Sequence, residues 1–202
     1  IIGEMNEDDI NVTGGVASYD IEGDVLSYRL LGDAPDGVSF SNGTLTVTPL
    51  ASDQALKQGQ TRVITLQYVA NDGQADSLPA TIQITINGMN DAPTGSATVI
   101  LSNAMANTTY TLLATDLLQG FSDVDGDILS IANLNAGHAT VVNNNNGTYT
   151  LTLEANYSGV VALSYQVIDG QGGSLAATQS FNVIVVNNTT GTTGADILQG
   201  GQ

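Results

Sequence analysis

The sequence contains no cysteine and no tryptophan, and only three of its 202 residues are basic. Without cysteine, neither a disulfide framework nor a thiolate metal site can form, so the fold depends on its core and on any bound ions. The net charge of −17 disfavours binding to nucleic acid and to anionic membranes, because both are themselves negative. No apolar run reaches the length of a transmembrane helix, so membrane insertion is not expected. Bound cations are the natural compensation for so acidic a chain.

Side chains that commonly carry out catalysis are also scarce. The one histidine, His138, lies in a Gly-His-Ala turn with no serine motif near it, and we expect an ordinary surface residue. A pair of carboxylates could serve a glycosidase, but aromatic residues amount to only 5% and provide few platforms for a sugar. The sequence therefore predicts a protein that is not an enzyme.

Short segments of alternating polarity, bounded by Asp, Gly and Pro, predict an all-β fold. Thr81 to Asn87, for example, sets Ile82, Ile84 and Ile86 on one face. Further strands are expected at 26–30, 44–48, 63–70, 97–101, 108–114, 127–132, 147–153, 160–168 and 178–186. A helical turn is expected only at 52–57, and the asparagines 143–146 before Gly147 indicate a hairpin turn.

The sequence repeats itself with an offset of 97 residues. Leu66-Gln-Tyr68 and Asp72-Gly-Gln74 recur as Leu163-Ser-Tyr165 and Asp169-Gly-Gln171, which places Tyr68 and Tyr165 at equivalent core positions. This duplication predicts two tandem immunoglobulin-like β-sandwiches, at 1–91 and 92–188, in an elongated arrangement with a stiff linker at Pro93 and a tail at 189–202.

Two acidic loops set carboxylates at alternate positions around a glycine. They read Asp20-Ile-Glu-Gly-Asp24 and Asp123-Val-Asp-Gly-Asp127, and their offset of 103 implies six residues inserted upstream of the second. Alternate residues of an extended segment point the same way, so these carboxylates would repel one another unless a cation lies between them. Calcium takes six to eight oxygen ligands in flexible geometry. A solvated acidic turn is the alternative for either loop alone, but two matching copies favour calcium sites. The predicted ligands in the loops are Asp20, Glu22, Asp24, Asp123, Asp125 and Asp127.

Three stretches resemble modules of bacterial adhesins. Gly43-Thr-Leu-Thr-Val47 and Ile84-Thr-Ile-Asn-Gly-Met-Asn-Asp-Ala-Pro93 resemble a VCBS repeat. Asp123-Val-Asp-Gly-Asp-Ile-Leu-Ser130 and Asp169-Gly-Gln-Gly-Gly173 are similar to bacterial cadherin-like repeats. Gly191-Thr-Thr-Gly-Ala-Asp-Ile-Leu-Gln-Gly-Gly201 resembles the opening of an RTX nonapeptide array, a mark of type I secretion, with a Gly/Thr linker as the alternative.

These resemblances imply a module of a large secreted adhesin, outside the cell or on the bacterial cell surface, with roles in cell adhesion and biofilms. In such proteins tandem modules act as spacers that stiffen when calcium fills the junctions, so the expected partners are neighbouring domains of the same polypeptide. Similarity to cadherin-type junctions adds Asn90, Asp91 and Asp169 to the predicted calcium ligands, and the duplication adds Asp72. Asn187-Asn188 replaces Asn-Asp after the second repeat, which weakens the case for an ion there. The alternative is an adhesive module that binds a host or cell-surface glycan or protein.

Overall fold

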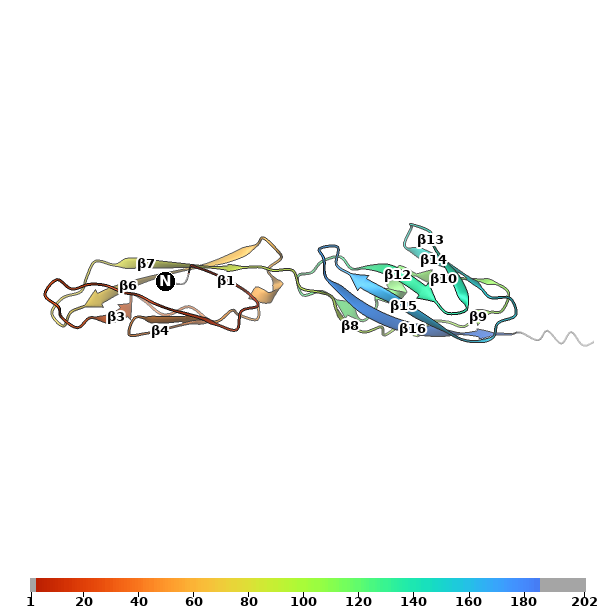
Figure 1. Ribbon diagram of the computed structural model, residues 1–202, viewed down its shortest axis with the longest axis horizontal. Coiled ribbons are helices and arrows are strands. Elements are labelled where there is room, and N and C mark those ends of the chain that lie inside the picture. Colours follow the sequence, from red (N-terminus) through yellow and green to blue (C-terminus); the bar gives the residue numbers. More distant parts are fainter. Residues whose placement is uncertain (1–2, 186–202) are drawn as a thin grey trace, which may run out of the picture. The chain divides into compact units, whose positions relative to one another are not determined.

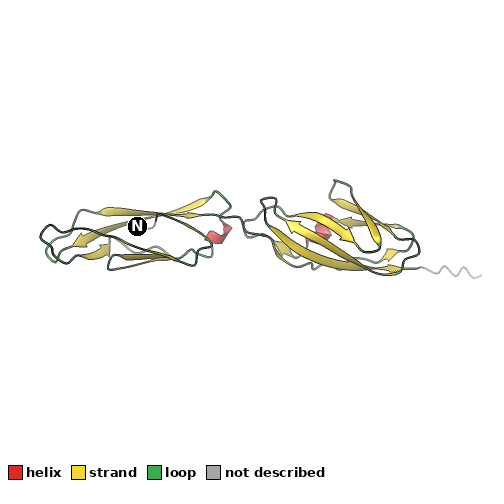
Figure 2. Cartoon of the chain, in the orientation of Figure 1, coloured by secondary structure: helices red, strands yellow, loops and turns green. Residues whose placement is uncertain are grey.

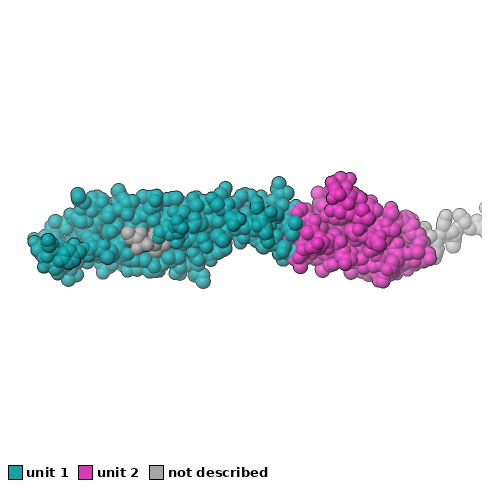
Figure 3. Space-filling model, turned by 45° about the horizontal axis from the view of Figure 1, so that its top comes forward, with its two compact units in different colours: residues 1–94, 122–129, 168–175 teal, residues 95–121, 130–167, 176–202 magenta. Residues whose placement is uncertain are grey.

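The computed structural model describes residues 3–185, so the predicted tail at 189–202 and the last residues of the second predicted domain lie outside the described residues. The chain is 49% strand and 4% helix, which confirms the all-β prediction (Figures 1 and 2). It divides into two compact units (Figure 3): the first comprises residues 1–94, 122–129 and 168–175, and the second comprises 95–121, 130–167 and 176–202. The predicted domain boundary between 91 and 92 stays a prediction.

The first unit holds two sheets. One has the order β1-β7-β6-β3 and the other the order β2-β5-β4. Their bounds are β1 Glu4–Asn6, β2 Val12–Gly15, β3 Ser27–Leu30, β4 Val38–Ser41, β5 Thr44–Val47, β6 Thr61–Asn71 and β7 Ala80–Asn87. The predicted helical turn is the 3-10 helix η1, Asp53–Ala55. β1 runs parallel to β7, with Asn6 opposite Asn87, so the residues that follow these two strands leave the sheet at the same end.

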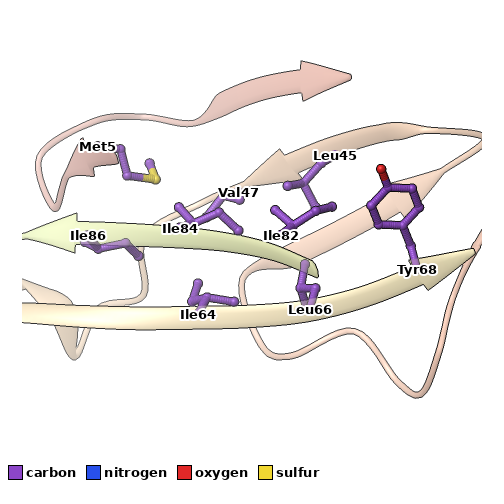
Figure 4. Packing of buried hydrophobic residues seen from close by; sticks show 9 residues of the cluster. All are labelled: Met5, Leu45, Val47, Ile64, Leu66, Tyr68, Ile82, Ile84 and Ile86. Carbon is purple, nitrogen blue, oxygen red and sulfur yellow. The ribbon is translucent and has the colours of Figure 1, made fainter. Parts of the chain in front are cut away.

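The core of the first unit lies between these sheets. Ile82, Ile84 and Ile86 are buried at alternate positions of β7, as their spacing predicted. Leu45 and Val47 of β5 pack against them from the other sheet, which makes the unit a β-sandwich. Figure 4 shows the nine buried side chains of this cluster: Met5, Leu45, Val47, Ile64, Leu66, Tyr68, Ile82, Ile84 and Ile86.

The second unit repeats this plan with sheets of order β10-β14-β13 and β12-β15-β16-β9. The bounds are β9 Ala104–Met105, β10 Thr109–Leu113, β12 Ser130–Ala136, β13 Ala139–Asn143, β14 Thr148–Leu153, β15 Gly159–Ile168 and β16 Ser174–Ile184. β8, Thr94–Gly95, and β11, Phe121–Ser122, form a two-stranded sheet. The predicted turn at 143–146 joins β13 and β14 as an antiparallel hairpin, with Asn145 and Gly147 at positive φ.

Both tyrosines singled out by the duplication are buried, Tyr68 with 8% and Tyr165 with 3% exposure, which confirms their equivalent core positions. The Tyr165 hydroxyl donates a hydrogen bond of 2.9 Å to the carbonyl of Leu117. Leu117 belongs to the short helix α1, Ala114–Leu118, between β10 and the second acidic loop. An offset of 97 carries β2 onto β10, so α1 occupies the place of the predicted insertion.

One predicted strand is wrong. Residues 97–101 keep an alternating pattern of burial, but they form no strand. The carbonyl of Val99 accepts a hydrogen bond of 2.6 Å from the Gln179 side chain, which satisfies it without a backbone ladder. β12 also begins at Ser130 rather than at the expected Asp127, because the acidic loop occupies 123–127.

In the part of the chain that the structure describes, no helix is long and apolar enough to cross a membrane.

Candidate metal centre

The acidic loop at 123–127 belongs to the first unit and folds into a tight turn. Gly126 has φ of 71°, a left-handed conformation that glycine adopts without strain, and its N–H donates to the Asp123 carbonyl. The Asp127 N–H donates to Asp123 Oδ1 over 3.3 Å. The turn gathers one carboxylate oxygen from each of Asp123, Asp125 and Asp127 within 4.8 Å of one another. Asp125 is buried, with 5% exposure.

The segment that follows β7 packs against this loop and against Asp169. The Asp91 N–H donates to Asp125 Oδ2 over 2.8 Å, and the Asn90 amide donates to Asp169 Oδ2 over 2.8 Å. The structure thus brings six of the predicted ligands together: Asn90, Asp91, Asp123, Asp125, Asp127 and Asp169.

Asp169 is buried and chiefly organises its own loop. Its Oδ1 accepts hydrogen bonds of 2.7, 3.0 and 3.0 Å from the N–H groups of Gln171, Gly172 and Gly173. Burial tends to raise the pKa of Asp169, but the hydrogen bonds from Asn90 and from this backbone outweigh it and lower the pKa. A Cβ at Gly173 would lie 2.2 Å from Asp169 Oδ2 and 2.8 Å from Ala92 Cα, so only glycine fits there.

Glu7 and Asp8 complete the cluster, and neither was predicted from the sequence. The parallel pairing of β1 with β7 brings them beside the segment 88–91, and the Met89 N–H donates to Glu7 Oε1 over 2.5 Å. Glu7, Asp8 and Asp91 each offer a carboxylate oxygen within 4.8 Å of the others, and Glu7 is only 2% exposed. The acidic run Glu7-Asp8-Asp9 was the available signal, but the register of a three-residue parallel strand cannot be read from sequence.

Four buried carboxylate oxygens of this cluster accept no hydrogen bond from any described residue: Glu7 Oε2, Asp91 Oδ2, Asp123 Oδ2 and Asp125 Oδ1. In Glu7, Asp123 and Asp125 the other oxygen accepts a backbone N–H, which fixes the carboxylate. Buried oxygens without a partner are costly unless they bind a cation. The arrangement therefore fits a hard cation, and the number of carboxylates suits calcium.

The electrostatics of the cluster agree with this fit. Burial raises the pKa of Glu7, and the nearby Asp8 and Asp91 raise it further, although the Met89 N–H opposes them. Burial also raises the pKa of Asp91, with additional repulsion from Asp8, Asp125 and Asp123. Since both groups are ionised less readily than usual, a bound cation would relieve the repulsion that they experience.

The first acidic loop has a similar turn but lies open. Asp20 Oδ1 accepts the N–H groups of Glu22 and Asp24 over 2.9 and 3.1 Å, and the three carboxylates offer oxygens within 4.8 Å of one another. Glu22 and Asp24 are exposed. Asp72, the counterpart of Asp169, lines a cleft of about 220 Å³ together with Asp20. Its Oδ1 accepts the N–H groups of Ala75 and Gln74, which lower the pKa of Asp72.

His138 belongs to the second unit, whereas both acidic loops belong to the first. It is half exposed, stacks on Tyr157 with ring centroids 4.1 Å apart, and pairs with Glu154 over 2.9 Å. This agrees with an ordinary surface residue.

Residues 89–184 match the family model of the cadherin-like domain. This part of the chain therefore has a cadherin-like fold, a class typical of extracellular, non-enzymatic β-sandwich modules that mediate adhesion. The match begins at Met89 and includes Asn90, Asp91, the second acidic loop and Asp169. No curated protein matches the chain.

The chain also aligns with parts of several solved structures. Human mucin-like protocadherin EC1-2 shares 18% identity at a TM-score of 0.49, over 91% of this chain and 95% of that one. Human protocadherin-24 EC1-2 shares 13% identity at a TM-score of 0.46, over 85% of this chain and 88% of that one. An endo-fucoidan hydrolase of glycoside hydrolase family 107 shares 21% identity at a TM-score of 0.35, over 91% of this chain but only 27% of its own.

Proposed function

We propose that this chain is a calcium-binding β-sandwich module that serves as a spacer in a large secreted bacterial adhesin and becomes rigid when calcium binds. The observation that supports this most strongly is the set of four unpartnered buried carboxylate oxygens, from Glu7, Asp91, Asp123 and Asp125. The acidic composition and the duplicated loops support it as well.

The rigidity follows from where the ligands lie in the sequence. Asp91 belongs to the first predicted domain and Asp125 to the second, although both lie in the first compact unit of the structure. Carboxylates from two rigid bodies can share one ion only in one relative orientation, so calcium held by both would restrict bending near Ala92 and Pro93.

The adhesin context and type I secretion rest on sequence resemblance alone. The VCBS-like residues include Gly43 to Val47 and Ile84 to Pro93, and the RTX-like stretch at 191–201 lies outside the described residues. Export of the full-length protein from a bacterium with and without a type I secretion system tests this part of the proposal.

Small-angle scattering of the chain in millimolar calcium and in chelator tests the spacer role. We expect a narrower distribution of dimensions in calcium, and the same loss of rigidity from chelator as from Asp125→Ala. Identical scattering under all three conditions contradicts the proposal of a calcium-stiffened spacer.

A second candidate function is adhesion to a glycan or protein. An open cleft of about 680 Å³ in the second unit favours it, lined in part by Val99, Ile100, Ser164 and Thr178, with Ile100 96% exposed. Saturable binding to a glycan or peptide array would support this role, and loss of the signal upon Thr178→Arg would locate it in the cleft.

A further inference from the structure

Lys57 contacts the candidate calcium ligands, whereas the other two basic residues of the sequence are engaged elsewhere. Lys57 Nζ lies 2.5 Å from Asp127 Oδ1. Arg62 makes two hydrogen bonds of 2.6 Å to Asp53, which is only 2% exposed. Arg29 pairs with the exposed Asp76 in the loop after β6. Among the described residues, Lys57 is thus the one basic side chain with an ion pair to a predicted calcium ligand of the second loop.

Two backbone hydrogen bonds hold the turn that carries Lys57 in place. The Gly88 N–H donates to the Gln60 carbonyl over 2.9 Å, and the Gln60 N–H donates to the Lys57 carbonyl over 2.8 Å. A Cβ at Gly88 would lie 2.4 Å from the Lys57 carbonyl oxygen, so glycine lets this turn approach the segment that carries Asn90 and Asp91. The position of Lys57 beside the ligands is therefore built into the fold.

The Lys57 side chain can nevertheless move away from Asp127. Its side chain is 43% exposed, whereas that of Asp127 is 12% exposed. Lys57 also lines a cleft of about 130 Å³ together with Asn90 and Asp127, which gives its ammonium group room to move. The hydrogen bond to Asp127 and the charges of Asp125 and Asp123 raise the pKa of Lys57, so it stays positively charged near neutral pH.

We propose that Lys57 is an internal counter-ion that competes with calcium for Asp127, and thereby stabilises the metal-free chain and weakens calcium binding at this site. The inference rests on the proposed calcium site. One positive charge relieves part of the repulsion among Asp123, Asp125 and Asp127 before calcium binds. The same charge occupies Asp127 Oδ1, which could otherwise bind calcium, and it repels an incoming cation. No described residue forms an ion pair with the first acidic loop, so the competition is confined to the second.

The test follows calcium binding at each loop separately. Gly23 and Gly126 each lie inside one acidic loop, so their backbone amide NMR signals report the two loops in one titration of the full chain. For Lys57→Gln we expect the Gly126 midpoint at about tenfold lower calcium, because the variant no longer places a positive charge beside the incoming ion. The Gly23 midpoint should not move. In chelator, the Tm of Lys57→Gln should fall by about 2 °C or more.

Arg29→Gln is the matched control, because it removes the same charge away from the second acidic loop, and we expect the Gly126 midpoint to shift less than twofold. Lys57→Arg keeps the charge and should also stay within twofold of the wild type. If Lys57→Gln behaves like Arg29→Gln, or binds calcium more weakly than the wild type, the competition is refuted while the calcium site stands. If the wild-type Gly126 signal does not respond to calcium up to about 10 mM, far above the affinity of extracellular modules, the calcium site itself fails and the inference falls with it.

Discussion

The two acidic loops form the same kind of turn, but another segment of the chain packs against the second loop and the first lies open. In each, the first aspartate accepts a backbone N–H from the residue four positions on. Asp125 is 5% exposed and accepts the Asp91 N–H, whereas its counterpart Glu22 is exposed to solvent. Val124 is 48% exposed, but its counterpart Ile21 is 84% exposed. The loop sequence therefore sets the turn, while burial of the carboxylates depends on a second segment of chain that packs against them.

The loops that carry Asp72 and Asp169 show the same contrast. Both aspartates accept N–H groups from their own turns. The position that follows Asp169 by four is Gly173, which fits closely under Ala92, whereas the equivalent position of the first repeat is Asp76, paired with Arg29. A side chain is tolerated where no segment approaches and is excluded where one does. A glycine at this position is thus a sign that another part of the chain covers the loop.

The largest expected effects concern the cores, where the two repeats should behave alike. Tyr68→Ala and Tyr165→Ala should each lower the free energy of unfolding by about 3 to 5 kcal/mol, the usual cost of truncating a buried aromatic residue. Tyr165→Ala should lie toward the upper end, because it also leaves the Leu117 carbonyl without its hydrogen bond. Urea denaturation measures both. A near-neutral result at either position would break the equivalence of the two cores.

Gly173→Ala and Asp76→Ala sharpen the comparison of the covered and open loops. The added Cβ at position 173 would overlap Asp169 Oδ2 and Ala92, so we expect a loss of about 2 kcal/mol or more in the free energy of unfolding. Asp76→Ala removes an exposed ion pair with Arg29 and an exposed hydrogen bond from the Asn71 side chain, so it should change the Tm much less. Equal effects in thermal melts would show that the two loops are not packed differently.

Asp125→Asn and Glu22→Gln compare the loops as calcium ligands. At calcium concentrations of 10 to 100 times the dissociation constant, each occupied site adds about 1.4 to 2.7 kcal/mol to the free energy of unfolding. Asp125→Asn should abolish the contribution of the covered site, and Glu22→Gln should reduce the calcium-dependent gain by less. Melts in millimolar calcium and in chelator measure the difference. A larger loss of calcium-dependent stability for Glu22→Gln than for Asp125→Asn would contradict this ranking of the two sites.

The smallest predicted effect is the pH dependence of the metal-free chain. Because the folded state raises the pKa of Glu7 and Asp91, it binds their protons more tightly than the unfolded state does. The chain in chelator should therefore gain stability as the pH falls from neutral toward the ordinary carboxyl range near about 4. Below that range the gain should reverse, as Asp169, whose pKa the fold lowers, becomes protonated. Glu7→Gln should diminish the gain, and a wild type that loses stability steadily from pH 7 downward would contradict the assignment.

Much of the fold could be predicted because its long strands bury strictly alternating residues. Ile82, Ile84 and Ile86, or Leu163 and Tyr165, leave little doubt about the face that is buried. Strands such as β1, β8 and β9 have only two or three residues, too few to establish a period. The segment 97–101 shows the opposite failure, because it alternates correctly but its Val99 carbonyl bonds to a side chain instead of a neighbouring strand.

The candidate site was predictable only where its residues are close in sequence. The loop Asp123 to Asp127 and the pair Asn90-Asp91 could be read from their spacing and from a family resemblance. Glu7 and Asp8 join the site through the parallel register of β1 with β7, and Lys57 joins it through the close approach that Gly88 allows. Both are long-range relations between backbone segments, and neither leaves a local pattern in the sequence.

A crystal structure grown in millimolar calcium, with anomalous scattering recorded to identify the ion, tests the central claim most directly. We predict calcium within about 2.3 to 2.6 Å of the four oxygens that lack a hydrogen bond, namely Glu7 Oε2, Asp91 Oδ2, Asp123 Oδ2 and Asp125 Oδ1, shared between one or more ions. If these oxygens instead contact only water or protein donors at saturating calcium, the cluster is not a calcium site.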